Sequence, residues 1–147
     1  MDKELIKSPE NTVRFYQSTN YTEEYIYDCL PIAIANFLVL HNVDNKIIEG
    51  TTQYLREHHS SHSGPTLADL TTITESSLCK ATQQLVSVTL LEGPCIRKDP
   101  TIIITEFDHC FHAWVYSAQY GRIEADGKTY DTLIPVHYLL QIHSNLL

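Results

Sequence analysis

The sequence has little positive charge and few glycines. Its 147 residues carry 10 lysines and arginines against 18 aspartates and glutamates, a formal net charge of −8, and they include 5 glycines. Since proteins bind a nucleic-acid backbone through clustered lysine and arginine, we expect no nucleic-acid partner. The sequence has no glycine-rich loop of the kind that cradles phosphate groups, and it predicts no cofactor.

Long apolar runs are also missing. The longest, Leu30–Leu40, is far shorter than the ~20 residues that span a bilayer, and Pro31 and Asn36 interrupt it. Residues 1–11 contain no apolar segment typical of a secretory signal. We therefore expect a cytoplasmic protein without a membrane partner, with secretion by a route without a cleaved signal left open.

Cysteine and histidine do not fall into metal-binding patterns. The cysteine spacings match no zinc motif, and a chain of this length buries enough core to fold without disulfides, so we expect reduced thiols. Two histidine groups, within residues 58–62 and 109–112, lack the convergent tetrahedral ligand set of a zinc site, and we expect no metal. The cysteines are Cys29, Cys79, Cys95 and Cys110.

The pattern of apolar residues predicts helices first and strands second. Hydrophobic residues make up 43% of the chain and charged residues 19%, as in a globular protein. The length fits a single domain over residues 1–147, with 1–11 as a loose N-terminus. The order of elements is typical of the α+β class, with N-terminal helices packed on a C-terminal antiparallel sheet. We expect helices at 28–42, 45–59, 66–76 and 135–143, and strands at 13–17, 85–91, 101–107, 113–118 and 121–125.

Cys29 lies at the start of the most apolar of these helices. Asp28 is a good N-cap, and Pro31 falls in the first turn, where its missing N–H costs nothing. The helix is apolar almost all round, which predicts a buried, central position. Unpaired N–H groups and the helix dipole at that end stabilise a thiolate, so Cys29 is a candidate nucleophile. The alternative is that Cys29 is only a small buried hydrophobe.

A nucleophilic cysteine needs a base and a group that orients the base. His112 precedes one predicted strand, and Asp126 follows the next. Because a tight turn joins these two antiparallel strands, the start of one lies beside the end of the other, and we expect the two side chains to be close. His109 and Asp131 are the alternative base and carboxylate, and a purely structural role stays open for each residue.

Several short motifs, taken in their order, resemble double-glycine leader peptidases and their stand-alone relatives, which are papain-like cysteine peptidases. Asp28-Cys29-Leu30-Pro31 and the apolar run after it are similar to the family's helix motif, Asp/Asn-Cys-Gly-Pro-x-Ala-x-Ala-x-x-Leu. The resemblance covers the chain from about Val13 to Tyr138. Residues 64–70, 100–104, 112–115 and 126–127 resemble the family's Gly-x-Ser-x-x-x-Leu, Pro-Val-Ile, His-x-Val-Val and Asp-Pro elements.

The oxyanion donor departs from the family pattern. The family's glutamine stands about six residues before the cysteine, where this chain has Glu23. A carboxylate there would repel a developing oxyanion. Gln17 is therefore the expected donor, with Asn20 as the alternative.

The resemblance implies a papain-like cysteine hydrolase that forms a thioester on Cys29, with His112 as base and Asp126 as the orienting group. Its substrate would be a peptide or protein amide. Leu30, which replaces the family's glycine, is expected to line the substrate groove, and Trp114 to lie in the groove wall or in the core. A transglutaminase, deamidase or acyltransferase with the same triad is one alternative, and a non-catalytic peptide-binding relative is the other. The oligomeric state stays open.

Overall fold

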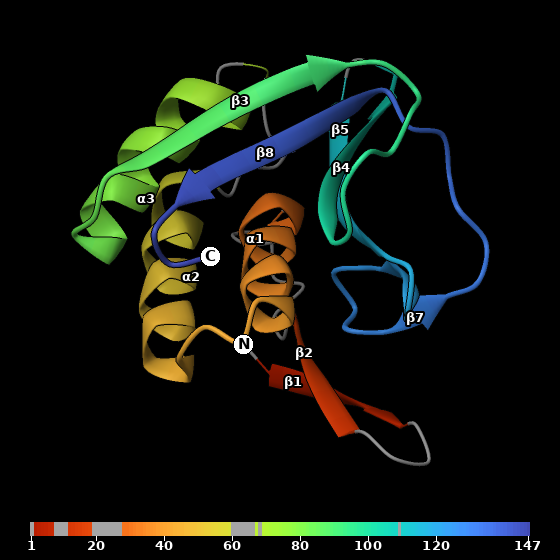
Figure 1. Ribbon diagram of the computed structural model, residues 1–147, viewed down its shortest axis with the longest axis horizontal. Coiled ribbons are helices and arrows are strands. Elements are labelled where there is room, and N and C mark those ends of the chain that lie inside the picture. The colour runs from red at the N-terminus through yellow and green to blue at the C-terminus, as the bar shows by residue number, and fades with distance from the viewer. Residues whose placement is uncertain (1, 8–11, 19–27, 60–66, 68, 109) are drawn as a thin grey trace.

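The computed structural model describes residues 2–7, 12–18, 28–59, 67, 69–108 and 110–147 (Figure 1). In chain order, the described helices are α1 (Cys29–Leu40), α2 (Asn45–His59), the π-helical segment η1 (Asp69–Ile73) and α3 (Thr74–Thr82). The described strands are β1 (Asp2–Lys7), β2 (Thr12–Gln17), β3 (Val86–Glu92), β4 (Thr101–Phe107), β5 (Cys110–Ser117), β6 (Gly121–Ile123), β7 (Thr129–Tyr130) and β8 (Tyr138–Ser144).

The helices pack against an antiparallel sheet formed by the second half of the chain. Its 6 strands follow the order β3-β8-β4-β5-β6-β7, and β1 and β2 form a separate antiparallel pair. Helices precede the main sheet in the chain, which confirms the predicted α+β class. None of the helices in the described ranges is both long and apolar enough to cross a membrane.

Helix α1 is the centre of the fold. Figure 1 shows it between α2 and α3 on one side and β4 and β5 on the other, with β3 and β8 crossing above. Every residue from Leu30 to Leu38 is buried, as expected for a helix that is apolar all round. Asn36 is the one polar residue in this buried stretch, and its side-chain amide is paired with β2. It accepts a hydrogen bond from the Tyr16 N–H at 2.6 Å and donates one to the Tyr16 carbonyl at 3.1 Å. These two bonds hold β2 against α1.

The two ends of the chain differ from the sequence prediction. Residues 2–7, expected to be loose, form strand β1, in which all six residues pair with β2 through the backbone. The expected closing helix at 135–143 is wrong, and strand β8 lies there between β3 and β4. A short apolar run fits a helix or a strand equally well, and here the neighbouring strands decide the outcome.

The predicted strands that flank His112 shift slightly. β5 begins at Cys110, so His112 lies inside the strand and not before it. β6 ends at Ile123, two residues earlier than expected. This early end matters for the site, because it releases the following residues from the ladder.

Candidate active site

Cys29 is the first residue of α1 and is half-buried. Asp28 occupies the N-cap position, and its carbonyl accepts the first helical hydrogen bond, from the Ile32 N–H at 3.2 Å. Its carboxylate makes no capping hydrogen bond, contrary to the usual role of an N-cap aspartate. The carboxylate is paired instead with Arg56 of α2, at 3.2 Å from Oδ2 to Nε. The Asp28 carboxylate therefore does not occupy the N–H groups of the first turn, which begins at Cys29.

His112 connects the thiol of Cys29 to a carboxylate. Its Nε2 donates a hydrogen bond to Oε1 of Glu124 at 2.6 Å, and its imidazole also interacts with Cys29. Because Nε2 is bonded to Glu124, Nδ1 is the ring nitrogen left for the thiol. Burial lowers the pKa of His112, but the hydrogen bonds and charges of Cys29 and Glu124 outweigh it and raise that pKa to about 10. These two partners therefore favour the charged form of the imidazole.

Glu124 is held from its far side by Arg122. The Arg122 guanidinium pairs with the second carboxylate oxygen of Glu124 through Nη1. Its Nε donates to the Thr132 carbonyl at 2.9 Å, and its Cζ lies over the Tyr130 ring, 4.4 Å from the ring centroid. Three contacts thus fix the guanidinium, and through it the carboxylate that bonds His112.

Asp126 does not bond the imidazole. Its carboxylate accepts hydrogen bonds from the Tyr130 hydroxyl and from the Lys128 N–H, the latter at 2.9 Å. The β5–β6 register pairs Val115 with Ile123 and, continued, would set His112 opposite Asp126. β6 stops at Ile123, and a turn closed by the Gly127 N–H on the Glu124 carbonyl takes Asp126 out of register.

Glu124 was missed although the sequence carried a signal for it. Residues two apart on a strand share a face, so Glu124 and Asp126 are both within the cross-strand neighbourhood of His112. The longer glutamate side chain reaches the imidazole on the diagonal. Asp126 is still close to the imidazole. Both line an open pocket of about 370 Å³, and the other lining residues are Arg122, Glu124, Ala125 and Tyr130.

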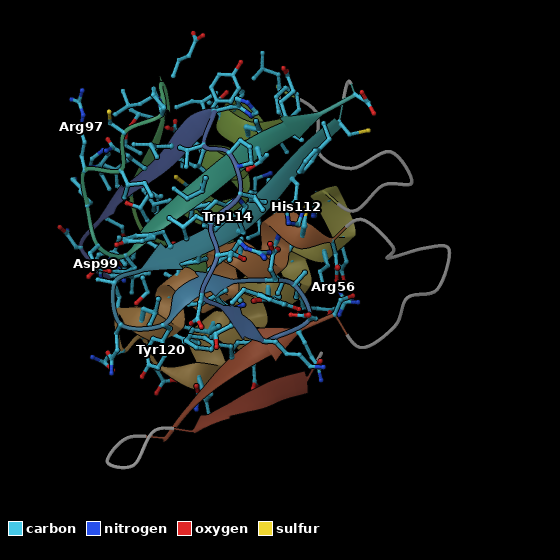
Figure 2. The ribbon with its side chains drawn as sticks, turned by 90° about the vertical axis from the view of Figure 1, so that its right-hand side faces the viewer. Arg56, Arg97, Asp99, His112, Trp114 and Tyr120 are labelled. Atoms are coloured by element: carbon cyan, nitrogen blue, oxygen red, sulfur yellow. The ribbon has the colours of Figure 1, made fainter. Side chains whose placement is uncertain are left out.

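The structure places neither Leu30 nor Trp114 at a groove, and Trp114 lies in the core, its other expected place. Each has no exposed surface, so neither can contact a substrate. Leu30 belongs to the core around α1. Trp114 packs with Ile103 and Leu139 on the opposite face of the sheet, and its indole N–H donates to Thr105 Oγ1 at 2.8 Å (Figure 2).

Gln17 ends β2 close to the site. The next residue, Ser18, donates its backbone N–H to the Ala125 carbonyl at 2.8 Å, directly after Glu124. The hydroxyl of Ser18 also lies beside the Asp28 carboxylate. The end of β2 is therefore next to both Cys29 and the Glu124 loop, and the oxyanion role of Gln17 stays a prediction.

The other candidates are either separate from this site or outside the described residues. Asn20, Glu23 and His109 lie outside them, and Asp131 is exposed after β7. In the described part of the chain, no group of His, Cys, Asp and Glu side chains could hold a metal ion. A larger pocket, of about 730 Å³, lies against Phe37 and His41 toward the other end of α1 and contains none of the candidates.

Comparison of the chain with protein-family models, with curated proteins and with solved structures finds no match.

Proposed function

We propose that this chain is a papain-like cysteine hydrolase that cleaves a peptide or protein amide through a thioester on Cys29. The observation that carries the proposal is the series Cys29, His112 and Glu124, in which one imidazole interacts with a helix-start thiol and donates to a carboxylate. A buried helix that begins at the cysteine and packs on an antiparallel sheet supports the papain-like architecture.

The attacking group is the thiolate of Cys29 beside the imidazolium of His112. The contacts that raise the pKa of His112 support this pairing, because a charged imidazole stabilises negative charge on the sulfur. The thiolate attacks the carbonyl carbon, and the carbonyl π electrons move onto oxygen. The Cys29 backbone N–H at the start of α1, together with Gln17, would stabilise that oxyanion.

Breakdown of the first intermediate releases the amine. His112 donates its proton to the leaving nitrogen as the C–N bond breaks, which leaves a thioester on Cys29 and a neutral imidazole. The imidazole then takes a proton from water as the water oxygen attacks the thioester. Collapse of the second intermediate releases the acid and restores the thiolate–imidazolium pair.

Glu124 would be a positioning residue. It touches no reacting atom, and its hydrogen bond to Nε2 keeps Nδ1 directed at the sulfur. Its negative charge also favours the imidazolium. The Arg122 contacts would keep the carboxylate in place through both steps.

The test begins with the reactivity of the four cysteines. We expect iodoacetamide at pH 7 to label Cys29 faster than the exposed Cys95, with peptide mapping by mass spectrometry as the readout. Cys29→Ala should abolish turnover of a peptide library, whereas the matched control Cys95→Ala should retain it. Addition of a small amine to the reaction separates hydrolysis from transfer, because transfer leaves an amine adduct of defined mass.

Two results would contradict the proposal. One is labelling of Cys29 no faster than Cys95, and the other is full turnover by Cys29→Ala. Thermal unfolding of each variant shows whether a loss reflects the missing thiol or a damaged fold.

A further inference from the structure

Asp28, the residue before Cys29, forms a buried ion pair with Arg56 of α2. Asp28 is 1% exposed and Arg56 is 6% exposed, and their charged atoms are 3.2 Å apart. Buried charges are rare, and a buried pair is often no more stable than two apolar side chains of the same size. Its presence next to Cys29 therefore calls for a reason other than stability.

The pair joins three parts of the chain. Asp28 precedes α1, Arg56 lies in the last turns of α2, and the hydroxyl of Ser18, after β2, lies against the same carboxylate. Ser18 also donates its N–H to the Ala125 carbonyl, next to Glu124. Ser18 thus lies between the start of α1 and the loop that carries Glu124, the carboxylate bonded to His112. Figure 2 shows Arg56 and His112 on the same side of the molecule.

Charge gives Arg56 a second role. An unpaired carboxylate at Asp28 would stand one residue from the sulfur and oppose negative charge on it. Burial raises the pKa of Asp28, while the Ser18 hydroxyl and the Arg56 charge act in the opposite direction. Among the described residues, two sets of charged groups bear on Cys29. Asp28, which precedes α1, pairs with Arg56 of α2, and His112 of β5 pairs with Glu124, which Arg122 of β6 also contacts.

We propose that Arg56 is a positioning residue for the nucleophile, holding the start of α1 through the Asp28 carboxylate and cancelling the negative charge next to Cys29. This inference rests on the proposed function of Cys29. It assigns to α2 a part in the reaction through the contact of Arg56 with Asp28.

The experiment uses the full chain and a chemical probe, so it needs no known substrate. The rate of iodoacetamide reaction at Cys29 is measured from pH 5 to 10 in wild type and in R56K, R56Q, D28N and D28N/R56Q. In R56Q we expect roughly a tenfold slower reaction at neutral pH, with the deficit growing as Asp28 ionises. D28N/R56Q should recover part of the rate, because no carboxylate is left to oppose the thiolate while the ion pair that holds α1 is still missing, and R56K should fall between wild type and R56Q.

Rescue by the second substitution separates electrostatic positioning from simple structural damage. Thermal unfolding monitors the fold, and the double variant is expected to fold even if R56Q does not, since it buries no unpaired charge. Equal loss of rate in R56Q and D28N/R56Q would overturn the proposal, as would wild-type rates in every Arg56 variant. If wild-type Cys29 reacts no faster than Cys95, the proposed function fails first and the role of Arg56 fails with it.

Discussion

Nε2 of His112 donates to Oε1 of Glu124 at 2.6 Å, and the imidazole interacts with Cys29 at the same time. The bond leaves one ring nitrogen for the thiol and places a negative charge on the opposite side of the ring. Glu124 is itself anchored by Arg122, so the imidazole is held by a network and not by a single contact.

Glu124→Gln should lower the rate of peptide turnover and move the basic limb of the pH–rate profile to lower pH. The reason is that a neutral amide no longer favours the imidazolium, so His112 loses its proton sooner as the pH rises. The measurement is kcat/KM against pH for wild type and the variant.

Asp126→Asn is the matched control for Glu124→Gln. Its carboxylate bonds Tyr130 and Lys128, not His112, so the basic limb should stay close to that of wild type. A shift in Asp126→Asn with none in Glu124→Gln would show that Asp126 orients the imidazole in the working enzyme.

The titration of His112 should respond to both of its partners. We expect the wild-type imidazole to lose its proton near pH 10, well above the ordinary value of 6.5, as followed by NMR of its ring carbons. Cys29→Ala and Glu124→Gln should each lower that pKa. The double variant should fall below the ordinary value, because burial is then the main remaining influence and it disfavours the charged ring. A pKa unchanged by both substitutions would mean that the imidazole does not interact with either group.

Gln17→Ala should separate the oxyanion donor from the nucleophile. Loss of one oxyanion donor lowers kcat by roughly 10²–10³. Alkylation of Cys29 by iodoacetamide forms no oxyanion, so its rate should stay near that of wild type. Unchanged kcat would remove Gln17 from the site, and slower alkylation would show that the substitution disturbs Cys29 itself.

Two glycines should respond to alanine in opposite directions. Gly121 has φ of +78°, and a Cβ there would overlap the Tyr130 carbonyl oxygen, so Gly121→Ala should destabilise the protein by about 1–3 kcal/mol. Gly50 lies in α2, where an added Cβ would have no atom within 4 Å apart from its chain neighbours and the nearby helix backbone, and Gly50→Ala should stabilise the protein by about 0.4–1 kcal/mol. Chemical denaturation measures both changes in the free energy of unfolding. Since Gly121 starts β6, its variant should also reduce the order of the Glu124 loop.

Local patterns were enough to predict much of the fold. The α+β class, the central burial of α1 and the position of Cys29 at its start follow from residues that are neighbours in the chain. Apolar periodicity and capping act over one or two helical turns, so they can be recognised in the sequence directly. The closeness of His112 to the Glu124–Asp126 segment also followed from a local feature, the tight turn between β5 and β6.

The remaining features depended on the tertiary structure. Residues 138–144 form a strand because they pair with β3 on one side and with β4 on the other. Both partners are far away in the chain. Glu124 and not Asp126 bonds His112 because β6 ends at Ile123 and the turn after it redirects Asp126 toward Tyr130. The burial of Leu30 and the pairing of Asp28 with Arg56 arise only when α2 and the sheet close around α1. Sequence patterns report local conformational preference, whereas long-range packing decides which side chains come into contact. The candidate site consists of such long-range contacts.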